Sequence, residues 1–320
     1  MATEDNVQGS ICSTDERHQQ MLETDILYKN AQTMLASINA SLTSGALLIA
    51  EHIRIPVVFH ILHHTNAQEI STEQIDSQID ALNRDFNLLN TDIDTVPSVW
   101  KGVVGNPKFT FFRTRRGPTG EKTEGIVKKY TYNKIFPDGS NAMKFDTTGG
   151  SNIWDRDRFL NIWVCDIGEV LGFAQFPAPG AARETDGVVI NYRYFGQIGT
   201  AKYPYNLGRT AVHEVGHWLN LRHIWGGDRT DPQYKKDDGV LDTPFCDGYN
   251  EGKPLFPKVS HKAKNGPNGD MFINYVSIPR TWTCLNRTFP FGLSRHRLNF
   301  DYAQPHLICF LIQVHETNIS

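Results

Sequence analysis

Hydrophobic and polar positions along the chain follow strand-like and helix-like patterns in turn between residues 54 and 220. Residues 54–62 are nearly all apolar and rich in β-branched and aromatic side chains, which predicts a buried strand. Ser71 begins a predicted helix, with Gln74 in the capping-box place. The apolar face of this helix recurs every three or four residues, at Ile75, Ile79, Leu82, Phe86 and Leu89. We interpret it as a helix that packs against a sheet.

Four later segments have the apolar, β-branched composition of strands: residues 108–113, 159–165, 171–177 and 187–192. The third ends at Pro177, which lacks the N–H needed to continue a ladder, so we expect an edge strand there. Residues 1–50 are a polar leader with a helical stretch from about Asp15 to Leu42, whose apolar face is moderate. The last part of the chain is rich in loops, and no internal repeat occurs.

The candidate chemistry lies in residues 213–223, a His-Glu-x-x-His run followed by a third histidine. Residues four apart share one face of an α-helix, so His213 and His217 can point at one ion with Glu214 beside them. His223 comes too far along for a straight helix, so the chain must turn near Asn220, a residue type that tolerates left-handed backbone. Three neutral imidazoles leave the fourth tetrahedral position of a zinc ion open to water, which indicates a catalytic site.

A zinc site of this kind predicts hydrolysis of a peptide bond. The ion lowers the pKa of its water from about 15.7 towards roughly 7. Glu214 can take the proton as the water attacks a peptide carbonyl, and then pass it to the leaving amine. The alternative is that a His-Glu-x-x-His run arises by chance. The third histidine, the turn-forming Asn220 and apolar residues on the expected buried side favour zinc.

Residues 213–223 resemble the extended zinc signature of the metzincin clan of metallopeptidases, and residues 206–226 are similar to the pappalysin family within it. Most metzincins have Gly where this chain has Asn220. The resemblance covers about residues 54–275 and implies an α+β fold: a twisted mixed β-sheet with a backing helix, a zinc-binding active-site helix and a loop-rich lower subdomain. It also implies a zinc endopeptidase of proteins whose zinc ligands and catalytic glutamate are His213, His217, His223 and Glu214.

The resemblance divides the chain into a propeptide-like leader (1–50), a catalytic domain (51–275) and a C-terminal segment (276–320). Family members often carry a Cys near the start of the leader, and Cys12 occupies that place. A thiolate is a good zinc ligand, so Cys12 could fill the open position until the leader is cut away, which predicts a zymogen. The alternative is a surface thiol near a frayed terminus.

Two further sets of residues are assigned by the resemblance. Substrate backbone is expected to lie extended along the edge strand formed by Leu171, Gly172, Phe173 and Ala174, although any edge strand has this pattern. A loop with Asp238, Asp242 and Thr243 resembles a segment that helps to hold calcium, an ion that prefers oxygen ligands; an acidic surface loop is the alternative. The predicted cofactors are one catalytic Zn²⁺ and, from this loop, Ca²⁺.

The resemblance stops after Tyr275. Metzincins continue into a tight turn that bears a Met beneath the zinc, and then Asp and Tyr, whereas this chain has Val276, Ser277 and Ile278. That Tyr is thought to stabilise the oxyanion of the tetrahedral intermediate. Val-Ser-Ile can be spelled GTA AGT AT, the consensus start of a eukaryotic intron, so one hypothesis is that residues 276–320 are translated intron. The alternatives to a working protease are a zinc-binding pseudoprotease without its Met-turn and a secreted structural module whose histidines bind no metal.

The composition is that of an ordinary globular protein, with 39% hydrophobic and 21% charged residues among 320. The net charge of −3 and the scattered Lys and Arg residues predict no nucleic-acid partner, and no apolar run is long enough for a membrane span. Protein or peptide substrates are the expected partners; the oligomeric state is not predicted. The resemblance implies secretion, although no signal peptide is evident. It also favours a disulfide bond, but five cysteines are an odd number, so they cannot all pair within the chain.

Overall fold

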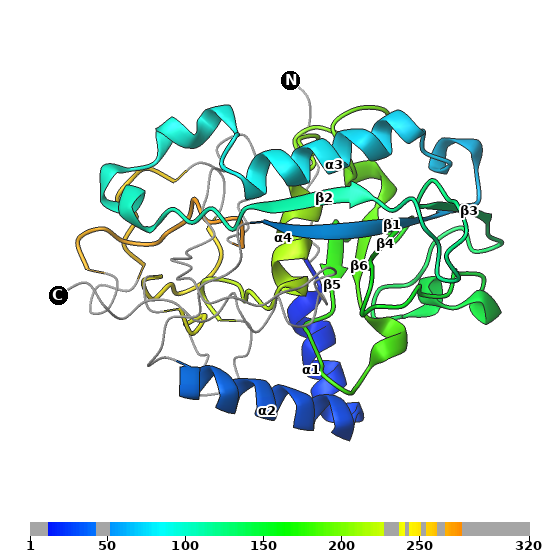
Figure 1. Ribbon diagram of the computed structural model, residues 1–320. Coiled ribbons are helices and arrows are strands. Elements are labelled where there is room, and N and C mark those ends of the chain that lie inside the picture. Colours follow the sequence, from blue (N-terminus) through cyan, green and yellow to red (C-terminus); the bar gives the residue numbers. More distant parts are fainter. Residues whose placement is uncertain are drawn as a thin grey trace.

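One mixed sheet of six strands organises the part of the chain that the computed structural model describes, residues 12–42, 52–226, 237–240, 243–250, 254–260 and 266–276 (Figure 1). The strands lie in the order β2-β1-β4-β6-β5, and β3 pairs with the C-terminal half of β1. All pairs are parallel except β5 with β6. The bounds are β1 Ile53–His63, β2 Phe109–Arg113, β3 Ile126–Tyr130, β4 Leu160–Cys165, β5 Gly172–Ala174 and β6 Val188–Asn191.

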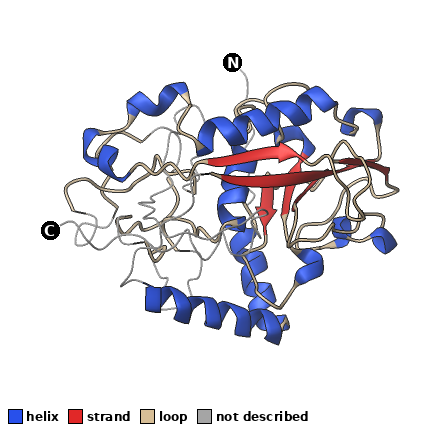
Figure 2. Cartoon of the chain, in the orientation of Figure 1, coloured by secondary structure: helices blue, strands red, loops and turns tan. Residues whose placement is uncertain are grey.

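Within the described ranges, four α-helices accompany the sheet. In Figure 1, α3 runs along the sheet above β1 and β2, α4 passes beside β5, and α1 and α2 lie below them. Loops make up much of the remaining described chain (Figure 2). The helices are α1 Thr14–Thr24, α2 Ile26–Leu42, α3 Thr72–Phe86 and α4 Arg209–Trp218. Short 3₁₀ helices span Asn66–Gln68, Thr91–Thr95, Ser98–Val103, Ala142–Lys144, Asp146–Thr148, Arg183–Thr185 and Tyr192–Tyr194.

The two faces of the sheet are covered differently, because successive side chains of a strand point to opposite faces. On β4, Ile162 and Val164 join the core that includes residues of α3 and α4. Trp163 and Cys165 join a second core under the loop that carries Phe136. Side chains alternate in the same way on β5, where Ala174 lies in the first core and Phe173 in the second. The α+β fold expected from the resemblance is confirmed.

Most predicted elements are present, with corrected bounds. The edge strand predicted at 171–177 is shorter, and β2 begins one residue late because Lys108 has a φ of +53°. β3 was not predicted: it reads Ile-Val-Lys-Lys-Tyr, is half-buried to exposed, and carries little apolar signal. In α3, Ser71 accepts a hydrogen bond from the Gln74 N–H as expected, but the Gln74 amide binds the Phe195 carbonyl instead of completing a capping box.

Two other helix predictions are corrected in detail. Leu89 lies beyond the end of α3 and is exposed. The helical stretch expected from about Asp15 to Leu42 consists of two helices, separated at Asp25. The Asp25 carboxylate accepts hydrogen bonds from the Leu27 and Tyr28 N–H groups, at 2.9 and 3.0 Å, and so caps the start of α2. Asp favours such capping positions over helix interiors because its side chain competes for backbone N–H groups.

Candidate metal centre and substrate cleft

The helix α4 carries the candidate metal ligands and is buried along its whole length. It follows Gly208, whose φ of +72° lets the chain turn into the helix. Arg209 anchors the first turn by pairing with Asp85, on α3, and with Asp92 at 2.9 Å. Val212 and Val215 belong to the core shared with the sheet. This apolar side fixes the rotation of the helix, so that the opposite side faces the cleft.

The turn after α4 brings the third histidine back to the first two. Asn220 has a φ of +74°, as the histidine spacing required. The Leu221 N–H donates to the Gly216 carbonyl at 2.9 Å, which closes the end of the helix. The predicted turn is confirmed, and His223 lies beside the α4 histidines as a result.

The three histidines converge on one point. Their Nε2 atoms are separated by 3.0 Å (His213 to His217), 3.2 Å (His217 to His223) and 3.3 Å (His213 to His223). Two nitrogens bound tetrahedrally to zinc at roughly 2.05 Å would lie about 3.3 Å apart, so the residues present fit this ion. Together with the Cys12 sulfur, these ligand atoms lie within 4.8 Å of one another.

Each of the three imidazoles is held by its other nitrogen. Nδ1 of His213 lies 2.6 Å from the Tyr275 carbonyl, and Nδ1 of His217 lies 2.7 Å from the Leu221 carbonyl. Nδ1 of His223 lies 2.6 Å from the carboxylate of Asp15. A proton on Nδ1 serves each of these acceptors and leaves the lone pair on Nε2, which is the tautomer that a metal ligand needs.

Burial keeps the α4 histidines neutral. Burial and the neighbouring His223 lower the pKa of His213 to about 3. The pKa of His217 is also held well below its usual value, by burial and by both neighbouring imidazoles. Two buried, uncharged imidazoles with converging lone pairs are suited to bind a soft or borderline cation.

Glu214 directly follows His213 on α4, and its carboxylate lies beside the leader. Its Oε2 accepts from the Thr14 hydroxyl at 3.1 Å and lies 3.6 Å from the Cys12 sulfur. Burial raises the pKa of Glu214 to about 8, against the opposing effect of these two contacts. Burial and the charge of Glu214 also raise the pKa of the Cys12 thiol.

The start of the leader lies along the edge strand β5. Cys12 forms a parallel bridge with Gly172, and the Ser13 N–H lies 3.4 Å from the Gly172 carbonyl. The Ala174 N–H donates to the Thr14 hydroxyl at 2.9 Å. The sequence singled out Cys12 and β5, and the structure brings them together. The contacts of Thr14 and Asp15 were missed, because a Ser-Thr-Asp run signals only a helix N-terminus.

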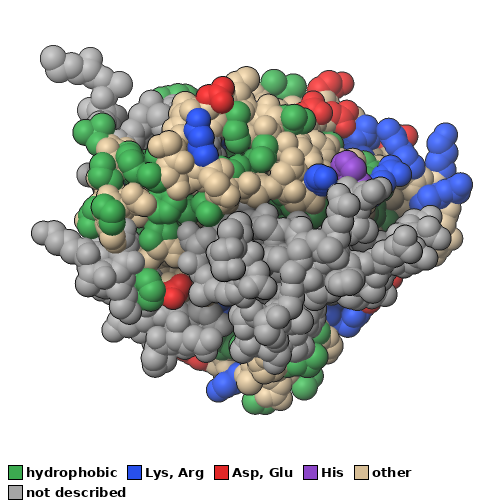
Figure 3. Space-filling model, turned by 60° about the vertical axis from the view of Figure 1, so that its left-hand side comes forward, with side chains coloured by type: hydrophobic (Ala, Val, Ile, Leu, Met, Phe, Trp, Pro, Cys, Tyr) green, Lys and Arg blue, Asp and Glu red, His purple; other side chains and the backbone are tan. Residues whose placement is uncertain are grey.

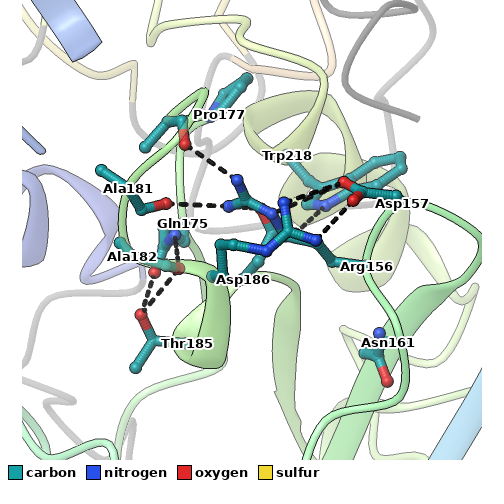
Figure 4. A network of polar contacts seen from close by, with 12 residues as sticks. Arg156, Asp157, Asn161, Gln175, Pro177, Ala181, Ala182, Thr185, Asp186 and Trp218 are labelled. Atoms are coloured by element: carbon teal, nitrogen blue, oxygen red, sulfur yellow. Dashed lines mark hydrogen bonds and ion pairs between the residues drawn. The ribbon is translucent and has the colours of Figure 1, made fainter. Parts of the chain in front are cut away.

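A polar network ties the loop after β5 to the end of α4 (Figure 4). Asp186 accepts from the Trp218 indole at 2.8 Å and pairs with Arg156 at 3.3 Å. Arg156 also donates to the carbonyls of Ala178 and Ala181, at 3.1 and 3.0 Å. The loop that continues the edge strand is thereby held against the helix that carries the candidate metal ligands.

The comparisons with known proteins agree with this arrangement. The family model described as pregnancy-associated plasma protein-A matches residues 146–278. A promirolysin variant of Tannerella forsythia is 37% identical, covering 95% of this chain and 94% of that chain with a TM-score of 0.79. Mirolysin in complex with a compound numbered 9 is 41% identical, covering 82% of this chain and 91% of that chain with a TM-score of 0.70. The chain belongs to the pappalysin family.

Curated relatives of this pappalysin are named extracellular metalloproteases. The one from Colletotrichum graminicola is 35% identical over 122 residues, 37% of this chain and 40% of that protein. The one from Verticillium alfalfae is 28% identical over 229 residues, 67% of this chain and 65% of that protein. The chain thus spans about two fifths to two thirds of the lengths of these two relatives. A metallopeptidase is confirmed as the class of protein.

The floor of the site departs from the metzincin pattern as the sequence indicated. Tyr275 supplies the carbonyl that orients His213, and Val276 is buried in the main core. An apolar side chain therefore packs at the place expected for the Met. Ser277, Ile278 and the rest of the proposed intron-derived segment lie outside the described residues, so that hypothesis stays a prediction.

The remaining site predictions have mixed outcomes. Asp238 and Thr243 are buried, and the Asp238 carboxylate accepts from the Val240 N–H at 3.0 Å; Asp242 lies outside the described residues. The calcium site stays a prediction. No disulfide joins the described cysteines, Cys12, Cys165 and Cys246, so the expected disulfide bond is not found there.

The sequence predicted neither a membrane span nor a nucleic-acid partner. No helix in the described ranges is both long and apolar enough to cross a bilayer. On the face shown in Figure 3, basic and acidic side chains both occur among many uncharged ones.

Proposed function

We propose that this pappalysin is a zinc endopeptidase made as a zymogen. His213, His217 and His223 hold the ion, and Glu214 is the general base and acid. The observation that carries the proposal is the convergence of three Nε2 atoms at 3.0–3.3 Å, each with its Nδ1 atom occupied by an acceptor. Three Nε2 lone pairs that converge without a donor between them are not expected in an ordinary core, where polar atoms pair donor with acceptor. The arrangement matches a tetrahedral zinc site with one open position.

The chain's own groups account for the proton transfers. Bound zinc supplies a Lewis acid that makes a water acidic at neutral pH. The Glu214 carboxylate lies 3.6 Å from the Cys12 sulfur, which is within 4.8 Å of the histidine nitrogens, so it can take the proton of that water. The same carboxyl can therefore deliver the proton to the amine that leaves when the peptide bond breaks.

The strand β5 is the proposed platform for substrate backbone. Its outward groups are the Gly172 carbonyl and the Ala174 N–H, and both are used by the leader. A peptide added at this edge would use the same groups by main-chain hydrogen bonding. Mature mirolysin has been solved with a cleaved peptide, and it is 40% identical to this chain, which supports protein or peptide substrates here.

The leader is the proposed source of latency. Cys12, Thr14 and Asp15 together cover the edge strand, the catalytic glutamate and the third histidine. Promirolysin, a precursor form by its name, matches 95% of this chain, whereas mature mirolysin matches 83%. We therefore propose that removal of residues 1 to about 50 opens the cleft. Secretion follows from the extracellular relatives as part of the same proposal.

The test is hydrolysis of a denatured protein by the chain before and after removal of the leader, with zinc and calcium present. A Glu214→Ala variant is the matched control, and the metal content of both is measured. Cleavage that appears on processing, is abolished by a chelator, returns with zinc and is missing from the variant is the expected result. Retained zinc without cleavage in the processed wild type would instead establish the pseudoprotease, and absence of stoichiometric zinc would establish the non-catalytic module.

A further inference from the structure

A buried ion pair joins the C-terminal end of α3 to the first residue of α4. Asp85 is fully buried, and its carboxylate accepts from Nε of Arg84 at 2.6 Å and from Nε of Arg209 at 3.3 Å. Arg209 is also buried, and a second nitrogen of its guanidinium donates to both carboxylate oxygens of Asp92 at 2.9 Å. Charge-assisted bonds to two carboxylates therefore fix where the Arg209 guanidinium lies.

The side chain of Tyr275 lies against this ion pair. Tyr275 is 2% exposed, and the centre of its ring lies 5.8 Å from Cζ of Arg209, within the range of a cation–π contact. Burial raises the pKa of Tyr275 well above its usual value, and the charge of Asp85 raises it further. Since a charge has this effect only from nearby, the phenol of Tyr275 lies beside the Asp85 carboxylate as well as the Arg209 guanidinium.

The backbone of the same residue contacts a candidate metal ligand. The Tyr275 carbonyl lies 2.6 Å from Nδ1 of His213. Arg209 and His213 are four residues apart on one face of α4, and Tyr275 meets the first with its ring and the second with its carbonyl. The neighbouring Val276 N–H donates to Oδ1 of Asn274 at 3.1 Å, which shapes the turn locally. The Tyr275 side chain therefore ties this turn to the start of α4.

The position of the Tyr275 carbonyl matters for metal binding. A proton that the carbonyl holds on Nδ1 of His213 leaves the lone pair on Nε2 and fixes the direction of the ring. The Nε2 atoms of the histidines converge only if each ring keeps its direction, so a carbonyl that moved would let the His213 ring turn away. Removal of a group that orients a metal ligand in this way typically lowers metal affinity by about 10–100-fold.

We propose that Asp85, Arg209 and the Tyr275 side chain are positioning residues for His213. The ion pair fixes the Tyr275 phenol, the phenol fixes the carbonyl of the same residue, and the carbonyl sets the tautomer and the direction of the imidazole. The three side chains act without touching the ion or the substrate. The inference rests on the proposed function, because it takes the ion that His213 binds to be zinc.

The experiment is a double-mutant cycle on the zinc affinity of the full chain, measured by competition with a chromophoric chelator. The single variants are Asp85→Asn and Tyr275→Phe, which remove a charge and a hydroxyl and nearly keep the size of each side chain. If Asp85→Asn does not fold, Asp92→Asn, which removes the partly exposed partner of Arg209, takes its place. The control is Leu62→Ala, which destabilises the fold from the second core, on the sheet face away from α4.

Each single variant is expected to bind zinc about fivefold more weakly, less than the loss typical of a removed acceptor because the carbonyl itself remains. If Asp85 acts through Tyr275, the double variant should bind at most about twofold more weakly than the weaker single variant. Leu62→Ala should keep the wild-type affinity.

Three results would overturn the proposal: single variants with wild-type affinity, losses that multiply in the double variant, or an equal loss in Leu62→Ala. A wild-type chain that binds no zinc would instead overturn the proposed function, and this inference with it.

Nuclear magnetic resonance of the zinc-loaded chain distinguishes positioning of one ligand from a general loosening of the site. With ¹⁵N-labelled histidine, the Nδ1–H protons of His213 and His217 report on their bonds to the Tyr275 and Leu221 carbonyls. In Tyr275→Phe, the His213 signal is expected to move and the His217 signal to stay. An unchanged His213 signal, or equal movement of both signals, would contradict the proposed positioning.

Discussion

The contribution of the left-handed backbone conformation of Asn220 to stability can be tested with two substitutions. Asn220→Gly and Asn220→Ala both remove the amide, so the loss of the amide cancels in their comparison and the φ of +74° contributes to the difference. A left-handed conformation costs an L-residue with a Cβ roughly 1–2 kcal/mol, whereas glycine adopts it freely. Glycine also loses more conformational entropy on folding, which offsets part of this strain energy. We therefore expect the alanine variant to be less stable than the glycine variant by about 1 kcal/mol.

The assay is thermal unfolding of both variants without metal and with saturating zinc. A difference of about 1 kcal/mol lowers the Tm of a domain of this size by roughly 2 °C. If the strain is instead relieved by displacing His223, the alanine variant will bind zinc up to about fivefold more weakly than the glycine variant. Alanine and glycine variants with equal Tm and equal zinc affinity would refute the view that this turn places the third ligand.

Three further predictions concern other parts of the molecule. Burial lowers the pKa of His60 to about 4. Because the pKa in the folded state lies below that in the unfolded state, the protein should lose about 3 kcal/mol of stability as the pH falls from 6.5 to 4. In metal-free unfolding experiments, the stability of a His60→Gln variant should depend less on pH. Asp25→Ala removes the cap of α2, worth about 1 kcal/mol, so proteolytic cleavage within the leader should be about fivefold faster, whereas Asp25→Asn should cleave like the wild type. Gly172→Ala places a Cβ 2.9 Å from the Val189 carbonyl and 3.0 Å from the Glu214 side chain; it should destabilise the processed chain by roughly 1–3 kcal/mol and reduce peptide hydrolysis, and wild-type kinetics in this variant would contradict the close packing of β5 on α4.

Local spacing was sufficient to predict that the three histidines lie together. The interval between His213 and His217 fixes one helix face, and the longer interval to His223 requires a turn, so the position of Asn220 follows without knowledge of the rest of the fold. The apolar period of α3 and the apolar run of β1 are equally local. These features were predictable because their physical cause lies within a few residues.

The features that the sequence did not predict depend on distant contacts or on single competing residues. Asp15 and Thr14 reach residues some 200 positions away, His223 and Glu214, and nothing in the leader's own pattern indicates those partners. Asp85 resembles any polar helical residue until its contacts are seen. β3 carries two lysines in five residues, and its place in the sheet is set by β1.

The most direct test of the zinc peptidase is a comparison of processed wild type with Glu214→Gln at equal zinc content. The glutamine keeps the size of the side chain and removes the base, so the account predicts one zinc per chain in both proteins and peptide hydrolysis only in the wild type, with the variant slower by at least about a hundredfold. Equal hydrolysis by the two proteins, or hydrolysis by wild type that persists after the zinc has been removed, would contradict it.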